Sequence, residues 1–514
     1  MPVPVGERLA LEDVVAVALG EAVELPAAAR DRVVAARRVV DGVVDRGDTV
    51  YGVTTGFGAL SDVRIDPAQT AALQHAIVRS HATAVGSLLS RPEARAMLML
   101  RSHVLALGHS GVRPEVIDLM VAMLNADVIP AVPEQGSLGA SGDLAPLANL
   151  ALPLIGGGEV LAAVGDGDRR GTEPTRDAFV RAGLAPLILQ AKEGLALVNG
   201  TQGMLAIGIL AADRLARLTR TADVVAAMSV EASLGTDAPF DARLQELRPH
   251  PGQVASAENL RALLAGSPIL ASHRDSPHLV QDAYSMRCAP QVHGAARDAL
   301  AYASGTLAIE ANAVSDNPIV LPDDDEVRSG GNFHGQPVAT ALDAMALATV
   351  PLASIAERRL YRLLDPKRSN GLPAFLVRES GLNSGFMLVQ YTAASLVSES
   401  KSLAHPASVD SITSSAGQED HVSMGMTAAR HARDVVSNAE TVLALEALAA
   451  AQALDLRAPL DPAPPTRAAR DRIRAEVAFL EADRELGPDI RSATALVREG
   501  ELVRAAERQT GPLA

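Results

Sequence analysis

The chain has 514 residues, and 46 Lys and Arg against 61 Asp and Glu give a formal net charge of −15. This charge makes nucleic acid and anionic membranes poor partners, and a single cysteine, Cys288, excludes an intrachain disulfide. The opening residues lack the pattern of a signal peptide, and no uncharged apolar run of about 18 residues predicts a membrane span. We therefore expect a soluble, cytoplasmic protein.

Helical periodicity dominates the chain, and strand-like alternation is nearly absent. Helices are predicted over residues 27–45, 67–89, 92–124, 145–164, 187–218, 291–311, 338–364, 390–402 and 424–456. Residues 48–61, with three glycines, are predicted as a loop, and Asn199-Gly200 should interrupt the surrounding helix. A proline-rich breaker, 460–470, precedes a charged helical tail.

The composition also indicates what builds the core. Aromatic residues make up only 2% of the chain, so Ala, Leu and Val must fill it, which favours closely packed helices. We predict an all-α fold: a loop-rich N-terminal domain over 1–205, then a long central helix bundle and a helical C-terminal part over 206–514.

The stretch GSLGASGDLAPLANL, residues 136–150, stands out as a glycine-rich loop before an apolar run. It has no phosphate-loop lysine, its glycines do not have dinucleotide spacing, and Asp143 replaces the last glycine of a nucleophile elbow. Its simplest interpretation is a turn in which Ser141 or Asp143 caps a helix, with Pro146 in the first turn.

Further polar stretches separate the apolar helices. They are YGVTTGFG (51–58), RSHATAVG (79–86), VNGTQ (198–202), QDAYSMRCAPQVHG (281–294), GGNFHGQP (330–337) and GQEDHVSMG (417–425). With GASGDLAPLA, these motifs resemble the aromatic amino-acid ammonia-lyases and their aminomutase relatives along nearly the whole chain. Within that superfamily, GQEDHVSMG preceded by LAHPASVDSI resembles the histidine branch. The tyrosine and phenylalanine enzymes usually carry Gln-Asp at this place, without the acidic residue that Glu419 supplies here.

The resemblance implies a prosthetic group made from the backbone, 4-methylideneimidazol-5-one. The amide nitrogen of Gly142 would attack the carbonyl of Ala140 with loss of water, and dehydration of Ser141 would add the methylene. Gly142 has no side chain to obstruct this approach. By the same resemblance, Asp143 and Phe333 assist closure. No pyridoxal phosphate is implied.

No catalytic metal is expected either. His421 follows Glu419 and Asp420, but three consecutive residues on a helix point about 100° apart and cannot converge on one ion.

The resemblance also assigns roles around the substrate. Tyr51 corresponds to the catalytic base, and its ordinary pKa of about 10 would have to be lowered by neighbours; the alternative is a tyrosine that packs a loop. Arg287 corresponds to a clamp for the substrate carboxylate, with a structural salt bridge as an equal alternative. Asn199 and Gln281 would bind the same end, unless they are turn residues, and Tyr284 would lie near the prosthetic group.

Two residues, His81 and Glu419, are the predicted determinants of substrate choice. An imidazole ring offers a hydrogen-bond donor and an acceptor, and His81 and Glu419 can pair with both. A phenyl ring in the same place would leave His81 and Glu419 without partners. Met387 resembles an apolar wall of the same pocket. The alternatives are a core or capping role for His81 and a solvated acidic pair of Glu419 with Asp420.

The leading hypothesis is conversion of L-histidine to trans-urocanate and ammonia, in a homotetramer whose subunits share active sites. Gly335-Gln336 also occurs in aminomutases, so a tyrosine or phenylalanine lyase or an aminomutase remains the sibling alternative. A serine hydrolase using Ser141 and a non-catalytic helical scaffold are the alternatives from other classes.

Overall fold

The computed structural model describes residues 1–66, 69–162, 171–275 and 280–514. It is 60% helix and 7% strand, which confirms the predicted all-α class. The strands of the described ranges are short and pair as β1 (Val3–Pro4) with β2 (Val23–Glu24), β3 (Val85–Leu88) with β4 (Pro133–Gln135), β5 (Glu159–Leu161) with β6 (Thr172–Pro174), and β7 (Ile319–Leu321) with β8 (Glu326–Arg328). The first pair is parallel and the others are antiparallel.

The chain folds into two compact units. The first comprises residues 1–210, 304–343 and 406–430, and the second comprises 211–303, 344–405 and 431–514. Each unit therefore draws on separated stretches of sequence. The predicted boundary at residue 205 stays a prediction.

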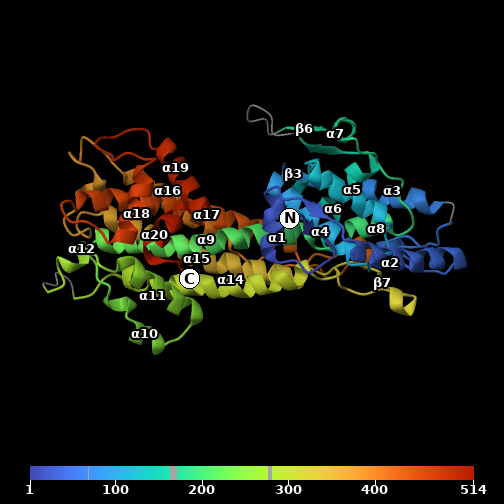
Figure 1. Ribbon diagram of the computed structural model, residues 1–514, viewed down its shortest axis with the longest axis horizontal. Helices are drawn as coiled ribbons and strands as arrows, with labels where there is room; N and C mark the ends of the chain where they lie inside the picture. The colour runs from blue at the N-terminus through green and yellow to red at the C-terminus, as the bar shows by residue number, and fades with distance from the viewer. Residues whose placement is uncertain (67–68, 163–170, 276–279) are drawn as a thin grey trace. The chain divides into compact units, whose positions relative to one another are not determined.

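The first unit contains the shorter helices of the N-terminal half (Figure 1). They are α1 (Leu11–Ala18), α2 (Ala27–Arg46), α3 (Thr70–His81), α4 (Arg91–Ala106), α5 (Pro114–Asn125), α6 (Leu144–Ala151), α7 (Thr175–Ala182) and α8 (Glu193–Val198). A capping box starts α4: Glu93 Oε2 accepts the Ser90 N–H (2.8 Å), and Ser90 Oγ accepts the Glu93 N–H (3.4 Å). From Glu93 to Ala106 this helix is buried, so it is the central helix of the unit.

A valine-rich cluster anchors the loop that carries Tyr51. Its buried members are Ala36, Val39, Val40, Val43, Val53, Ala191 and Val320. Val53, two residues after Tyr51, packs there with side chains of α2 and with Val320 of β7. Apolar packing thus attaches one end of a glycine-rich loop to the body of the unit.

Four long helices have residues in both units: α9 (Gln202–Ala232), α14 (Ala289–Ala311), α15 (Gln336–Leu364) and α17 (Gly425–Leu456). In the second unit, buried polar pairs join them. Arg359 of α15 forms an ion pair with Glu446 of α17 (2.6 Å), and His293 Nδ1 of α14 is hydrogen-bonded to Asp223 of α9 (2.7 Å). Small alanines on α17, many with no exposed surface, let these helices pack closely.

The remaining helices belong to the second unit. They are α10 (Ala242–Glu246), α11 (Pro251–Leu264), α12 (Pro268–Ala271), α13 (Tyr284–Arg287), α16 (Met387–Leu403), α18 (Pro464–Arg474), α19 (Gly487–Arg498) and α20 (Glu501–Thr510). The charged helical tail is confirmed, but α18 begins inside the predicted breaker. Proline at its first positions costs no internal hydrogen bond.

The helices predicted over 27–45, 291–311, 338–364, 390–402 and 424–456 are confirmed within a few residues. The helix over 92–124 is wrong, because Gly108 and Gly111 adopt positive φ and divide it into α4 and α5. The segments 67–89 and 145–164 each end in a short strand after a shorter helix, and 67–68 and 163–164 lie outside the described residues. Helix 187–218 begins only at 193 and breaks at 199–201, as expected for Asn199-Gly200.

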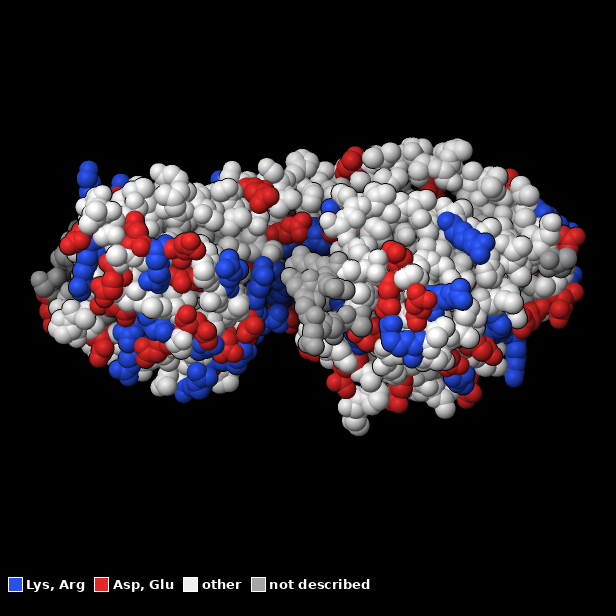
Figure 2. Space-filling view, turned by 90° about the horizontal axis from the view of Figure 1, so that it is seen from above, with Lys and Arg blue, Asp and Glu red and all other residues white. Residues whose placement is uncertain are grey.

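One described helix, α15, is long and apolar enough to cross a membrane by length and composition alone. Of its most apolar window, 61% is buried inside the protein, as in the core helix of a soluble protein. On the face drawn in Figure 2, acidic and basic side chains are interspersed. That pattern is typical of a solvated surface.

Candidate active site

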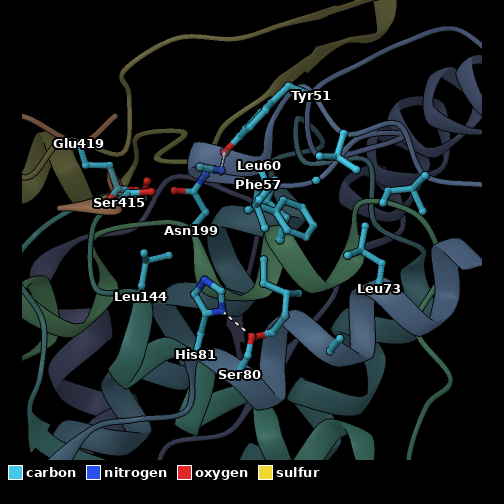
Figure 3. A pocket seen from close by; sticks show the side chains of 18 residues that line it. Tyr51, Phe57, Leu60, Leu73, Ser80, His81, Leu144, Asn199, Ser415 and Glu419 are labelled. Atoms are coloured by element: carbon cyan, nitrogen blue, oxygen red, sulfur yellow. Dashed lines mark hydrogen bonds between the residues drawn. The ribbon is translucent and has the colours of Figure 1, made fainter. Parts of the chain in front are cut away.

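A cavity of about 520 Å³ opens in the first unit between the loop over 51–60, helices α3 and α8, and the loop over 414–419 (Figure 3). Five predicted site residues line it: Tyr51, His81, Ser141, Asn199 and Glu419. They come from five separate stretches of sequence. The fold therefore brings together most of the predicted residues of this unit.

The Ala-Ser-Gly tripeptide forms a tight turn beside this cavity. Ser141 has a φ of 50° and Gly142 a φ of 79°, and the Gly142 N–H donates to the carbonyl oxygen of Gly139 (3.3 Å). A Cβ on Gly142 would overlap the carbonyl group of Gly200. Only glycine fits at position 142, the residue expected from the resemblance to supply the attacking nitrogen.

Asp143 stands at the N-cap position of α6, as the turn predicted, but its side chain makes no capping hydrogen bond, so the predicted side-chain cap is wrong. The Asp143 carboxylate instead accepts the N–H of Met204 (2.7 Å) at the start of α9 and the hydroxyl of Ser137 (2.9 Å). Free N–H groups and the positive end of the helix dipole make this end of α9 a natural partner for a carboxylate. Burial nevertheless raises the pKa of Asp143 from 3.8 to about 6, outweighing these hydrogen bonds.

The raised pKa of Asp143 predicts a pH-dependent stability. The folded chain binds this proton more tightly than the unfolded chain, so stability falls as pH rises from about 4 to 6. A shift of about two pKa units corresponds to about 3 kcal/mol. We therefore expect the free energy of unfolding in urea to fall between pH 4.5 and pH 7 by up to this amount more in wild type than in Asp143→Asn.

A second variant tests the cause of that difference. Ser137→Ala removes a donor to the Asp143 carboxylate, so the same loss of stability should move to higher pH. Parallel stability curves for wild type and Asp143→Asn would contradict the prediction.

Tyr51 points its hydroxyl toward the cavity (Figure 3), where the oxygen accepts the N–H of Gly58 (3.2 Å). Burial raises the pKa of Tyr51, the Gly58 hydrogen bond lowers it, and the charge of Glu419 raises it again. The lowered pKa that the base role calls for is therefore not provided by the neighbours of Tyr51 within this unit. Desolvation and a nearby carboxylate both disfavour the phenolate.

His81 and Glu419 form the polar part of the cavity wall. His81 ends α3, and its Nδ1 lies 3.0 Å from Ser80 Oγ. Burial lowers the pKa of His81, partly offset by a backbone hydrogen bond and by the charge of Glu419, so the ring is neutral at pH 7. Glu419 accepts the hydroxyl of Ser414 (2.9 Å), whereas Asp420 is exposed. The two acids are therefore not an equivalent solvated pair.

Residues 419–421 precede α17 and are not helical, so helix geometry does not keep their side chains apart as expected. The ring of His421 instead stacks on His334, with ring centroids 5.9 Å apart. Among the described residues, no group of three potential ligands could hold a metal ion.

Of the predicted residues Asn199 and Phe333, only Asn199 lines the cavity. Its Nδ2 donates to the carbonyl oxygen of Asn317 (2.8 Å), and its Oδ1 is buried without a partner among the described residues. It therefore has a free acceptor for a ligand donor. Phe333 is half-buried in the loop before α15 and is not among the lining residues.

The other predicted site residues, Gln281, Tyr284, Arg287 and Met387, belong to the second unit. The Arg287 guanidinium lies 4.6 Å from the centroid of the Tyr284 ring. Its Nε is buried without a hydrogen-bond partner among the described residues. Gln281 is exposed, and Met387 begins α16 half-buried. Their roles stay predictions.

Sequence reasoning missed several residues that the fold adds. Ser415 lines the cavity, and its Oγ accepts the N–H of Ala59 (3.3 Å), which links the two flanking loops. Leu144 and Leu195 supply apolar wall. Arg101, buried in the apolar run MLMLRSHVLA, was also missed, although one charged residue in such a run is a detectable signal.

The chain matches the family model described as aromatic amino acid lyase over residues 9–475. It is 56% identical over 500 residues to a histidine ammonia-lyase of Anaeromyxobacter sp. (strain K), covering 97% of this chain and 98% of that protein.

Two solved structures give the same picture of the fold. A histidine ammonia-lyase from Trypanosoma cruzi matches with a TM-score of 0.91 at 42% identity, covering 99% of this chain and 96% of that chain. A tyrosine aminomutase from Streptomyces globisporus matches with a TM-score of 0.93 at 39% identity, covering 100% of both chains. Lyases and aminomutases thus share this fold, and substrate choice must lie in side chains.

Proposed function

Because this chain belongs to the aromatic amino acid lyase family, we propose that it is an ammonia-lyase that converts L-histidine to trans-urocanate and ammonia. One observation carries the choice of substrate: a neutral His81 and the carboxylate of Glu419 both line the cavity that also contains Tyr51 and Ser141. The identity to histidine ammonia-lyases over nearly the whole chain supports the same choice.

The residues at 140–142 fit the prosthetic group that this family uses. The tripeptide is Ala-Ser-Gly, its backbone is already turned at Ser141 and Gly142, and Gly200 leaves no room for a side chain at Gly142. A methylideneimidazolone formed from these residues would supply the electrophile that unmodified side chains lack.

The chain's own side chains bind and orient the substrate. A neutral imidazole has one donor and one acceptor, and Glu419 can accept from one ring nitrogen while His81 meets the other. Asn199 offers its free Oδ1 to the substrate amino group. Arg287, with its unpaired Nε and its planar donors, is the proposed clamp for the carboxylate.

Tyr51 is the proposed base. In its ionised form its oxygen would take the proton from the β-carbon of the substrate. The electron pair of that C–H bond becomes the new C=C bond, and ammonia leaves with the electron pair of the C–N bond. A phenol held by one main-chain N–H can move this proton without displacing the loop.

The direct test compares histidine, tyrosine and phenylalanine side by side. Appearance of urocanate from histidine supports the proposal. Turnover of tyrosine without urocanate would reject it in favour of the sibling activity.

Glu419→Gln tests the specificity role. An amide accepts a ring N–H less strongly than a carboxylate, so kcat/KM for histidine should fall by about 10- to 100-fold, the equivalent of about 1–3 kcal/mol. Activity toward tyrosine or phenylalanine should not fall with it. Asp420→Asn, which removes the exposed neighbouring acid, is the matched control. An equal loss for all three amino acids would mean that Glu419 does not distinguish the imidazole ring of the substrate from a phenyl ring.

We also propose a cytoplasmic homotetramer whose subunits share active sites. Large exposed apolar side chains support association: Tyr302 and Ile309 on α14 and Leu388 and Tyr391 on α16 are each more than half exposed. Light scattering should return a tetramer. An active monomer would refute this proposal.

A further inference from the structure

Residues 199–201, called the strap below, join α8 to α9 and lie against the Ala-Ser-Gly tripeptide. The N–H of Gly200 donates to the carbonyl oxygen of Ser141 (3.2 Å), and the N–H of Asp143 donates to the carbonyl oxygen of Gly200 (2.7 Å). These two bonds bracket the nitrogen of Gly142. The strap therefore determines how the backbone of the tripeptide is held.

Arg101 contacts the strap from the core of the unit. It lies on α4 with no exposed surface, and its guanidinium donates to Gln202 Oε1 (2.7 Å) and to the carbonyl oxygen of Ala196. A Cβ on Gly200 would overlap Arg101 Nη1. Because Ala196 precedes the strap and Gln202 follows it, one side chain ties both of its ends.

The surroundings of Arg101 are polar and buried. Gln202 Nε2 donates to Ser315 Oγ (2.7 Å), and the buried pair Lys192–Asp316 (2.9 Å) lies in the same cluster. Burial lowers the pKa of Arg101 to about 10, although the charge of Asp316 raises it, so the guanidinium keeps its charge at pH 7. The charge of Arg101 also helps to lower the pKa of Lys192.

This arrangement is costly for stability. The guanidinium of Arg101 donates only to the neutral oxygens of Gln202 and Ala196, and its Nε has no partner among the described residues. A buried cation bound in this way costs free energy that an apolar side chain of similar length would not. What Arg101 adds is a fixed geometry: its planar donors reach two acceptors at once.

We propose that Arg101 is a positioning residue that holds the strap against residues 140–142, so that formation of the prosthetic group depends on it. This inference rests on the proposed function. Without the guanidinium, Ala196 and Gln202 lose a shared donor, and the strap can move relative to the tripeptide. Ring closure requires the Gly142 nitrogen to approach the Ala140 carbonyl, and a displacement of about 1 Å in such a reaction costs about 100-fold in rate.

The experiment measures ring formation directly, by peptide mass across residues 136–150 in full-length protein sampled at intervals after synthesis. Ring formation removes two water molecules from this peptide. Arg101→Met should lose water about 100-fold more slowly than wild type. The matched control is Arg95→Met, which removes another buried arginine of α4, one that binds Asp127 (2.8 Å) and carbonyl groups away from the strap. Circular dichroism and thermal unfolding establish that both variants fold.

Each outcome has a distinct meaning. Slow water loss in folded Arg101→Met with a normal rate in Arg95→Met supports the proposal, and a normal rate in both overturns it. If Arg101→Met does not fold, Arg101→Lys and Gln202→Met decide: slowed water loss in either one supports the clamp, and wild-type rates in both overturn it. Wild-type protein that never loses water would instead refute the proposed function itself.

Discussion

Replacing Ser141 with alanine is expected to abolish turnover of histidine, with kcat reduced by at least about 1,000-fold, while the fold is kept. Alanine has no hydroxyl to lose, so the methylene carbon of the proposed electrophile cannot form. The side chain lines the cavity but makes no hydrogen bond that supports the turn, which is held by the Gly139, Gly142 and Gly200 backbone. Stability should therefore change little, and the loss should lie in the chemistry.

The measurement pairs urocanate formation with peptide mass across residues 136–150. Wild type should lack the mass of two water molecules, and Ser141→Ala should not. Ser87→Ala, on the exposed strand β3, is the control and should keep both activity and modification. A serine hydrolase would also lose activity with Ser141→Ala, but its wild-type peptide would carry no modification. Full activity in Ser141→Ala would refute the electrophile.

Tyr51→Phe is expected to lower kcat by about 100- to 10,000-fold, the usual contribution of a positioned acid–base group. Phenylalanine keeps the ring and removes the oxygen that accepts the Gly58 N–H. Binding of histidine should be nearly unchanged, because the proposed contacts to the imidazole belong to His81 and Glu419.

The pH dependence sharpens this test. Burial raises the pKa of Tyr51, so only a small fraction of the enzyme carries the phenolate at pH 7, and that fraction grows as pH rises. Wild-type kcat/KM should therefore increase from pH 7 toward alkaline pH. If the rise of kcat/KM with pH persists in Tyr51→Phe, it reflects titration of the substrate amino group. If it disappears, it reflects titration of Tyr51. Tyr361→Phe, at an exposed position of α15, controls for loss of a hydroxyl elsewhere. Unchanged kcat in Tyr51→Phe would require another base.

The elements of the fold were predictable where local pattern decides them. The long helices α14, α15, α16 and α17 follow from apolar spacing over several turns. The single predicted helix over 92–124 failed because Gly108 and Gly111 take positive φ values to pass close to side chains of α2 and β7. Periodicity on either side of the break continues, so the pattern by itself does not reveal it.

For the candidate site, too, the sequence pointed to the residues, whereas the folded surroundings set their properties. Residues 140–142 carry their chemistry in their own side chains and backbone, and the motif identified them together with Tyr51, His81, Asn199 and Glu419. The properties of these residues depend on what surrounds them. The base role of Tyr51 called for a pKa lowered by neighbours, and burial raises it. Asp143 stands at the N-cap of its own helix, but its carboxylate binds the start of α9 instead of capping α6.

The amino-acid sequence alone determined the helical class, the Ala-Ser-Gly tripeptide proposed to form the ring, and the candidate residues around it. Those features depend on each residue's chemistry and on neighbours within a few positions along the chain. Only the tertiary structure decided that Asp143 meets Met204, 61 residues away, and that Arg101 meets Gln202, 101 residues away. Burial and hydrogen-bond partners arise when distant segments pack together, and they set the pKa values and positions on which the chemistry depends.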